Sequence, residues 1–266
     1  MMNDEGETME KRKQIIAMGG GGFSMEPGNP LLDDYILSQC PVKKPGICLV
    51  PTASKDHMDY IRDFYEFFMT RQCSPRHLSL TDPGPPVGDL EKFLLANDII
   101  YVTGGHTGYM LAAWRAFGLD IILKKAWQMG ILLAGVSAGA SCWFEAGLTD
   151  SKPGRLSGEP CLGFLKGSHC AHYENKGRRP AFHRLIARGK LPEGIGTENG
   201  AALHFIDGEL KTVVASRPGA AAYIIRKGSQ RVTGITEEKI EGVRLGGRVQ
   251  RATCREQALP VPYNIL

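Results

Sequence analysis

The chain has 266 residues, of which 42% are hydrophobic and 23% charged, a composition typical of a globular protein that excludes disordered and fibrous classes. Its 32 basic and 28 acidic residues give a net charge of +4 with no long basic run, so no nucleic-acid partner is expected. Glycine is over-represented, with 33 residues against roughly 19 at the average usage of about 7%.

Residues 1–13 are polar and of mixed charge, which predicts a flexible tail, and residues 14–266 are expected to form a single α/β domain. The tail lacks the apolar core of a signal peptide, and no apolar segment reaches the roughly 18 residues of a membrane helix. The seven cysteines are scattered without a CxxC pair, which favours reduced thiols. Together these features predict a cytoplasmic protein with no membrane contact.

Short apolar segments alternate with helix-like segments over the first half of the chain. They predict strands at 14–18, 47–51, 98–103 and 131–136, with helices at 30–39, 57–72 and 108–127. Nearly continuous apolarity is typical of strands that are buried on both faces. The alternation therefore predicts a doubly wound, mostly parallel sheet with right-handed crossovers.

The second half of the chain has a less regular pattern. Residues 151–179 are rich in Gly, Pro, His and Cys with little periodicity, so we expect loops packed on the sheet, followed by a short helix at 180–188. Strands at 201–206 and 210–216 flank an Asp-Gly turn, and a further strand is expected at 221–226. These segments predict a C-terminal β-hairpin extension of the sheet.

A Gly-x-Ser-x-Gly motif, centred on Ser137, follows the fourth predicted strand directly. Glycines two residues before and after the serine allow a tight strand-to-helix turn that exposes the hydroxyl at the edge of the sheet. The amide of Ala138, at the start of the following helix, can then stabilise an oxyanion. Ser137 is a candidate nucleophile, and the alternative is a helix N-cap serine between glycines.

A second glycine-rich segment, TGGHTG, follows the third predicted strand. The amide of Gly105 can complete an oxyanion hole with Ala138, and Gly104 and Thr107 are candidates for contact with substrate, although a simple tight turn is an equal alternative. The glycines at 19–22 match neither a dinucleotide-binding nor a P-loop motif, so they are expected to open the first strand onto the same crevice.

A serine nucleophile needs a base and a group that orients the base. His172 is the expected base, with His169 in reserve, and the alternatives are an HxxH metal site, which lacks the usual partner motifs, or two structural histidines. Asp150 and Glu198 are the candidate acids, and each can equally be a cap or turn residue. No metal or organic cofactor is required.

Two arginines, Arg178 and Arg179, follow the expected base. The planar guanidinium group matches a carboxylate well, so a functional role would indicate an acidic substrate, and the common alternative is an exposed basic pair.

The segments TGGHTGYML and GVSAGASCWF, with the histidine loop and RRPAF after it, resemble the peptidase E family of aspartyl dipeptidases and, more distantly, cyanophycinase. The resemblance implies a class I glutamine amidotransferase-like fold and an intracellular serine peptidase that removes N-terminal aspartate from dipeptides. It places Ser137 as nucleophile, His172 as base, Gly105 with Ala138 as oxyanion hole, and Arg179 on the substrate aspartate.

The third member of the triad departs from the family pattern. Peptidase E has an aspartate in a TND-x-P loop, whereas Asp150 here is offset by one residue, and cyanophycinase uses a glutamate near the position of Glu198 and Asn199. The resulting hypothesis is a serine peptidase with a small peptide as its partner. The alternatives are a catalytically silent binder of acidic amino acids or peptides, and an esterase or amidase; a homodimer is compatible with each.

Twelve of the 33 glycines fall in four segments, at 19–22, 104–108, 135–139 and 194–200. We expect these segments to surround one crevice, because glycine lets the main chain approach a ligand closely.

Overall fold

The computed structural model describes residues 12–81, 88–152, 154–228 and 234–246. Residues 1–11 of the expected tail lie outside these ranges, and the amide of Lys13 is already held by the Asp207 carboxylate at 3.1 Å. None of the helices described is long and apolar enough to cross a membrane.

The first sheet has eight strands in the order β14-β11-β10-β1-β5-β4-β2-β3. Its strands are β1 (Gln14–Met18), β2 (Gly46–Val50), β3 (Ser74–His77), β4 (Ile99–Val102), β5 (Leu132–Val136), β10 (Ala201–Ile206), β11 (Glu209–Ala215) and β14 (Val243–Arg244). The five strands from β1 to β3 in this order run parallel, and β10 pairs antiparallel with β1. The predicted parallel sheet is confirmed, with boundaries within one residue for its first four predicted strands.

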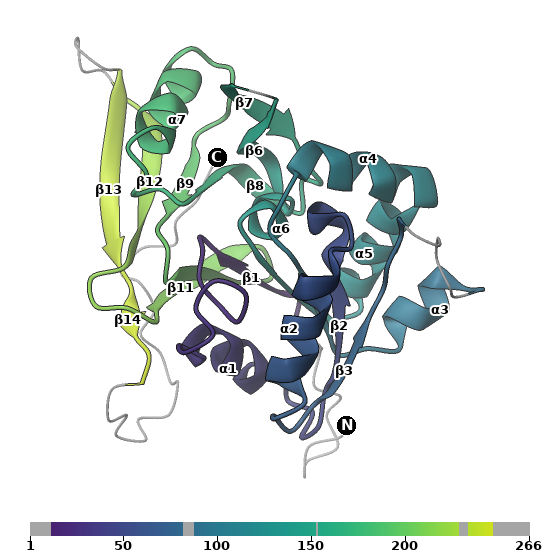
Figure 1. Cartoon of the computed structure of the whole chain (residues 1–266). Helices are drawn as coiled ribbons and strands as arrows, with labels where there is room; N and C mark the ends of the chain where they lie inside the picture. The colour runs from purple at the N-terminus through teal and green to yellow at the C-terminus, as the bar shows by residue number, and fades with distance from the viewer. Residues whose placement is uncertain (1–11, 82–87, 153, 229–233, 247–266) are drawn as a thin grey trace.

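Helices cover both faces of this sheet (Figure 1). The helical segments are α1 (Leu31–Ser38), the 3₁₀ turn η1 (Pro51–Ser54), α2 (Met58–Phe68), α3 (Leu90–Leu95), α4 (Thr107–Phe117), α5 (Leu119–Gln128), α6 (Ala138–Ser141) and α7 (Arg178–Ala187). Alternate residues of β1 enter two different cores: Ile16 packs with α1 and α2, whereas Ile15 packs with α3, α4 and α5. This double burial explains why the strand is apolar at every position from Ile15 to Met18.

One predicted helix, at 108–127, is two helices in the structure. Gly118 adopts a left-handed conformation, with φ of 69°, and ends α4 while α5 begins at the next residue. Glycine at this position is a common helix terminator because it adopts positive φ without steric cost.

The second sheet is the main feature that the sequence pattern does not predict, although the strand expected at 221–226 is confirmed as one of its members. It has six strands in the order β13-β12-β9-β8-β6-β7. They are β6 (Phe144–Lys152), β7 (Arg155–Pro160), β8 (Leu165–Ala171), β9 (Gly194–Thr197), β12 (Ala221–Lys227) and β13 (Ile235–Glu241). The expectation of loops over 151–179 is therefore wrong. In β8 the polar side chains of Ser168 and His169 are fully buried because hydrogen bonds satisfy them, so the strand shows no apolar alternation.

The predicted β-hairpin is confirmed, and it extends the first sheet as β10 and β11. Asp207 and Gly208, at the turn, both have positive φ (55° and 90°), as a two-residue type I′ turn requires. The antiparallel pairing of β10 with β1 brings the loop that precedes β10 to the end of β1. Loops from both sheets thus meet around α6 (Figure 1).

Candidate active site

Ser137 lies in a strained turn between β5 and α6. Its φ and ψ of 56° and −109° are an unusual combination for a residue with a side chain, and its amide donates to Met18 O at 3.0 Å. A Cβ atom at Gly135 would lie 2.2 Å from the carbonyl oxygen of Gly139, and one at Gly139 would lie 2.4 Å from that of Val102. Both glycines of the motif are therefore needed for the tight turn that presents the Ser137 hydroxyl.

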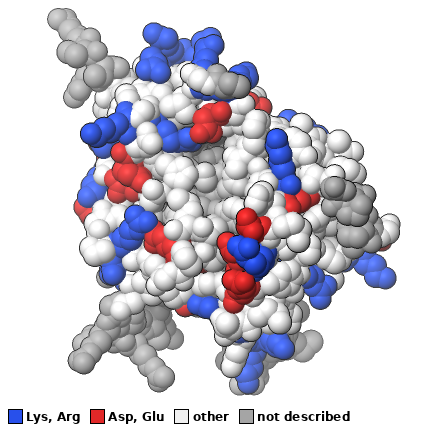
Figure 2. Space-filling view, viewed as in Figure 1, with Lys and Arg blue, Asp and Glu red and all other residues white. Residues whose placement is uncertain are grey.

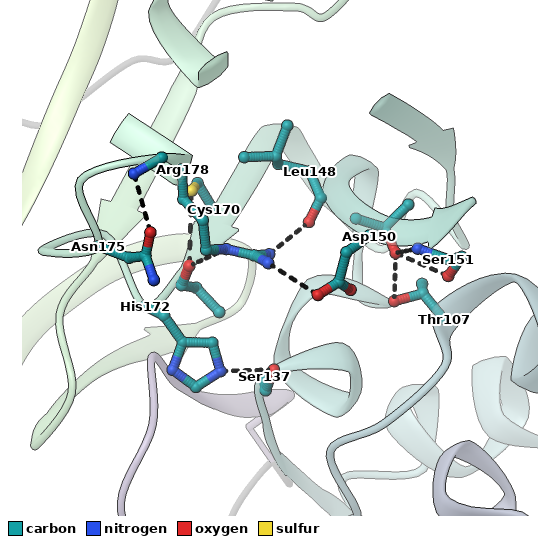
Figure 3. Close-up of polar contacts among 12 residues, drawn as sticks. Thr107, Ser137, Leu148, Asp150, Ser151, Cys170, His172, Asn175 and Arg178 are labelled. Carbon is teal, nitrogen blue, oxygen red and sulfur yellow. Dashed lines mark hydrogen bonds and ion pairs between the residues drawn. The ribbon is translucent and has the colours of Figure 1, made fainter. Parts of the chain in front are cut away.

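His172 follows β8 directly and faces this hydroxyl (Figure 3). Its Nε2 atom lies 2.9 Å from Ser137 Oγ. The backbone of His172 has a positive φ of 54°, and its amide donates to Gly19 O at 3.1 Å, so the glycine-rich segment after β1 helps to hold the imidazole. The serine and histidine are in the geometry in which a histidine can accept the proton of a nucleophilic serine.

The other side of the imidazole contacts an amide and not a carboxylate. His172 Nδ1 lies 2.6 Å from Asn199 Oδ1, in the loop after β9. An amide oxygen can only accept a hydrogen bond, so this contact selects the tautomer with the proton on Nδ1 and leaves Nε2 able to accept from Ser137. Gly20 makes room for the contact, because a Cβ there would lie 1.8 Å from Asn199 Oδ1.

Neither predicted acid reaches the imidazole. Glu198 faces β12, where it accepts hydrogen bonds from the Tyr223 hydroxyl at 3.0 Å and the Ala221 amide at 3.1 Å. The Asp150 side chain is 74% exposed, and its ion-pair partner is Arg178, at 3.6 Å. The structure thus differs from the prediction that Asp150 or Glu198 orients the base. The side chains of Glu198 and Asn199 point to opposite sides of their loop, and that of Asn199 is on the side of His172.

Ala138 follows Ser137 directly, and the loop of Gly105, the other predicted oxyanion residue, lies beside Ser137. The loop that carries Gly105 approaches it closely, since a Cβ at Gly104 would lie 3.4 Å from Ser137 Cβ. Within the part of the chain that the structure describes, the amides of Gly105 and Ala138 have no hydrogen-bond acceptor. Both amides are available to a ligand oxygen.

Replacing Gly105 by alanine is expected to destabilise the protein. Gly105 has φ of 139°, and an added Cβ would lie 2.1 Å from the backbone oxygen of Ala53. We expect Gly105→Ala to lower the free energy of unfolding by about 2 kcal/mol or more in a urea titration. Gly28→Ala is the control, because a Cβ there has no atom within 4 Å, and a change within about 0.5 kcal/mol is expected. Equal urea midpoints for the two variants would contradict the steric argument.

The Thr107 side chain is engaged within the protein, which differs from the expected contact with substrate. Its side chain is buried, with Oγ1 at 3.4 Å from Thr149 Oγ1, and Thr149 Oγ1 is 2.7 Å from Ser151 Oγ. Ser151 Oγ in turn accepts from the Gly108 amide at 3.2 Å. These hydroxyl groups connect the start of α4 with the end of β6, so their role is structural.

The two adjacent arginines have different surroundings. Arg179, the arginine that the resemblance places on the substrate, forms an ion pair with Glu237, and its guanidinium lies over the rings of Tyr173 and Tyr223. It is therefore engaged within the protein, which differs from the expectation. Glu237 comes from β13, a strand of the unpredicted sheet, so the sequence offers no sign of this pairing.

Arg178 brings its guanidinium to the site instead. Its Nε donates to Ala171 O and its Nη2 to Leu148 O, each at 2.9 Å, and the side chain is only 12% exposed. Nη1 remains directed at Asp150 (Figure 3). Because Ala171 precedes His172, these bonds hold a mostly buried cation next to the segment that carries His172.

Charged side chains of both signs are interspersed on the face seen in Figure 2, and the central area over α6 and β1 is largely uncharged.

His169, the reserve base, is a structural residue. It is fully buried, and its two ring nitrogens lie 2.8 Å from Ser141 Oγ and 3.1 Å from Thr197 Oγ1. Burial, together with the nearby charges of Arg178 and His172, lowers its pKa to about 3, so it is neutral at physiological pH. The HxxH alternative is not supported, because the two histidines point into separate networks, and the described residues contain no group of three metal-ligating side chains.

All four glycine segments meet as expected, although two glycines of the fourth have another role. A Cβ at Gly19 would lie 2.4 Å from the backbone oxygens of Thr197 and Glu198, which shows how tightly the first segment packs against the Asn199 loop. Within the fourth segment, Gly194 and Gly196 lie in β9, where a Cβ would strike Ser168 and Tyr173 respectively. These two glycines therefore serve the packing of β9 against its neighbours.

Comparisons with known proteins identify the family. The model of peptidase family S51 matches residues 15–213. The uncharacterized peptidase YgaJ of Bacillus subtilis strain 168 is 51% identical over 224 residues, which cover 84% of this chain and 96% of that protein. Two solved structures share the fold, each at 18% sequence identity. A peptidase from an acI-B1 Actinobacterium has a TM-score of 0.67, and the match covers 87% of this chain and 95% of that one. A putative peptidase E protein from Listeria monocytogenes EGD-e has a TM-score of 0.57, and the match covers 77% of this chain and 98% of that one. The chain therefore belongs to peptidase family S51, the peptidase E family, and is a serine peptidase.

Proposed function

We propose that the protein releases N-terminal aspartate from dipeptides and other short peptides through an acyl-enzyme intermediate. The observation that supports this mechanism best is the 2.9 Å distance between Ser137 Oγ and His172 Nε2 at a strained turn. Backbone strain that persists at a partly buried hydroxyl beside a histidine is characteristic of a nucleophile held in place for reaction.

In the proposed reaction, Ser137 Oγ attacks the carbonyl carbon of the first residue while His172 Nε2 takes the hydroxyl proton. The amides of Gly105 and Ala138 donate to the oxyanion of the tetrahedral intermediate. His172 then gives the proton to the leaving amine, which departs and leaves the acyl-enzyme. In the second half of the reaction, His172 takes a proton from water, the water oxygen attacks the acyl carbon, and His172 returns the proton to Ser137 Oγ as the ester bond breaks.

Asn199 takes the place of the acid in this mechanism. By accepting from Nδ1–H at 2.6 Å, its amide oxygen keeps the imidazole in the productive tautomer and orientation. As a neutral group it stabilises the imidazolium less than a carboxylate does, through one hydrogen bond to a charged ring. The proposed triad is therefore Ser137, His172 and Asn199.

Arg178 is the proposed receptor of the aspartate side chain. Two backbone carbonyls fix its guanidinium, which reduces the entropy lost when a carboxylate binds, and Nη1 is still directed at a loosely held partner. Arg179 has both its ion-pair partner and its aromatic neighbours within the protein and is not assigned this role.

The test of the function is a set of substrates. The purified protein is incubated with Asp-Leu, Asn-Leu, Glu-Leu and Ala-Leu and with an aryl ester, and released products are separated by chromatography. We expect Asp-Leu to be cleaved fastest, with Asn-Leu, its uncharged isostere, at least about 10-fold slower because one charge-assisted hydrogen bond is lost. Binding of Asp-Leu without turnover would replace this proposal with the silent binder, and turnover of the ester alone with an esterase.

The neighbouring arginines supply a matched pair of variants. We expect Arg178→Met to lower kcat/KM for Asp-Leu by roughly 10- to 100-fold and to remove the preference over Asn-Leu, because the carboxylate loses its charged donor. Arg179→Met is expected to retain the preference. Turnover of Asn-Leu in both variants controls for folding. A preference lost in Arg179→Met and retained in Arg178→Met would assign the substrate aspartate to Arg179 instead.

A further inference from the structure

Asp150 is a charged side chain at the edge of the site that the proposed mechanism does not use. We propose that Asp150 is the residue that binds the α-ammonium group of the peptide. This inference rests on the proposed function and deepens it, since it names the side chain that recognises the amino group of the first residue.

The position of Asp150 follows from the bonds of its neighbours in β6. Thr149 and Ser151 turn inward, and Ser151 Oγ is bonded to the Gly108 amide, at the start of the helix that follows the Gly105 loop. Asp150 lies between them and is 74% exposed. On its other side stands Arg178, which is bonded to the residue before His172. Asp150 therefore lies between the segment that carries the oxyanion amide and the segment that carries the base.

The Asp150 carboxylate has unused capacity to bind a cation. Its ion pair with Arg178 is 3.6 Å long, and no hydrogen bond to its oxygens is formed by the residues that the structure describes. The carboxylates of Glu174 and Glu198, in the surrounding loops, already accept hydrogen bonds. Glu174 accepts from the backbone N–H of Asn199, and Glu198 accepts from the Tyr223 hydroxyl and the Ala221 backbone N–H. Asp150 is thus the acidic group of this site that is open to a substrate.

The chemistry of the substrate fits this arrangement. The α-ammonium is attached to the carbon next to the scissile carbonyl, so the group that binds it must lie close to the nucleophile and the oxyanion hole. In an N-terminal aspartate the ammonium and the side-chain carboxylate are on adjacent carbons. Asp150 and Arg178, which are adjacent and loosely paired, present the two complementary charges side by side (Figure 3). Binding exchanges one loose ion pair for two charge-assisted contacts.

Kinetics with two peptides test the inference. Asp-Leu and N-acetyl-Asp-Leu, which lacks the ammonium, are compared on the wild-type protein and on Asp150→Asn. We expect Asp150→Asn to lower kcat/KM for Asp-Leu by roughly 10- to 100-fold, mainly through KM, and to leave the slow turnover of N-acetyl-Asp-Leu unchanged. In the wild type, kcat/KM for Asp-Leu should fall above about pH 8, where the α-amino group loses its proton, and this limb should be absent in Asp150→Asn.

Asp34→Asn is the matched control, because Asp34 is also an exposed aspartate paired with a more buried arginine, Arg71, at 3.1 Å. It should leave both substrates and the pH profile unchanged. Equal losses on both peptides in Asp150→Asn would show that Asp150 acts only by positioning Arg178. Wild-type turnover of N-acetyl-Asp-Leu at the rate of Asp-Leu would also overturn the inference.

A binding measurement separates this inference from the proposed function. Calorimetric titration of Ser137→Ala with both peptides needs no turnover. Tighter binding of Asp-Leu than of N-acetyl-Asp-Leu, lost in Ser137→Ala/Asp150→Asn, supports the role of Asp150 even if the wild type cleaves neither peptide and the peptidase proposal fails. Equal binding of the two peptides to Ser137→Ala overturns the role of Asp150.

Discussion

Ser137→Ala and His172→Ala are each expected to lower kcat for Asp-Leu by about 10⁴- to 10⁶-fold, the range found when a member of a serine triad is removed. The reason is the single proton path between Ser137 Oγ and His172 Nε2, which are 2.9 Å apart. Because the two groups act as a unit, Ser137→Ala/His172→Ala should cost no more than either single change. The measurement is release of free aspartate, with thermal unfolding to confirm that each variant is folded.

Labelling with a fluorophosphonate examines the same pair without a peptide. The wild type should gain one adduct on Ser137 in an intact-mass spectrum, His172→Ala should react much more slowly, and Ser137→Ala should not react. His169→Gln is not a neutral control, because His169 is buried between Ser141 and Thr197 and its loss would disturb the fold. Retention of peptide turnover in Ser137→Ala would contradict the assignment of the nucleophile.

Asn199→Ala is expected to lower kcat by roughly 10- to 100-fold, the worth of one hydrogen bond to a ring that becomes charged in the reaction. Without the 2.6 Å contact to Nδ1, the imidazole can take the other tautomer, in which Nε2 carries the proton and cannot accept one from Ser137. Initial rates of Asp-Leu hydrolysis over a pH series measure the effect.

Asn199→Asp distinguishes orientation from simple packing. A carboxylate at this position still accepts from Nδ1–H and also favours the imidazolium, so we expect activity to be retained and the acidic limb of the pH–rate profile to move to higher pH. Glu198→Gln should leave that limb in place, because Glu198 faces Tyr223 and Ala221. A shifted limb in Glu198→Gln together with full activity in Asn199→Ala would return the third position to Glu198.

The parallel core of the fold is predictable from sequence because its signals are local. In β1 every residue is apolar from Ile15 to Met18 since both faces of the strand are covered, and the pattern of the following helices is equally strong. The second sheet escapes prediction because β7 and β8 have few apolar residues in alternation. His169 is a polar residue that is nevertheless fully buried, because side chains of β9 and α6 form hydrogen bonds with both of its ring nitrogens. Only the folded protein brings these partners to it.

By itself, the sequence determined the position of the tight turn at Ser137, the identity of His172 as the candidate base, and the glycine segments of Gly19 and Gly104 that approach the site closely. These features depend on backbone geometry within a few residues, which motif and composition encode directly. Only the tertiary structure decided that Asn199 and not Glu198 meets the imidazole, and that Arg178 and not Arg179 is bonded to the residue before His172. In both cases either of two adjacent residues could occupy the position near His172, and partners from strands distant in sequence determine which one does. Tyr223 of β12 binds Glu198, and Glu237 of β13 binds Arg179, so each of these side chains is held away from the imidazole.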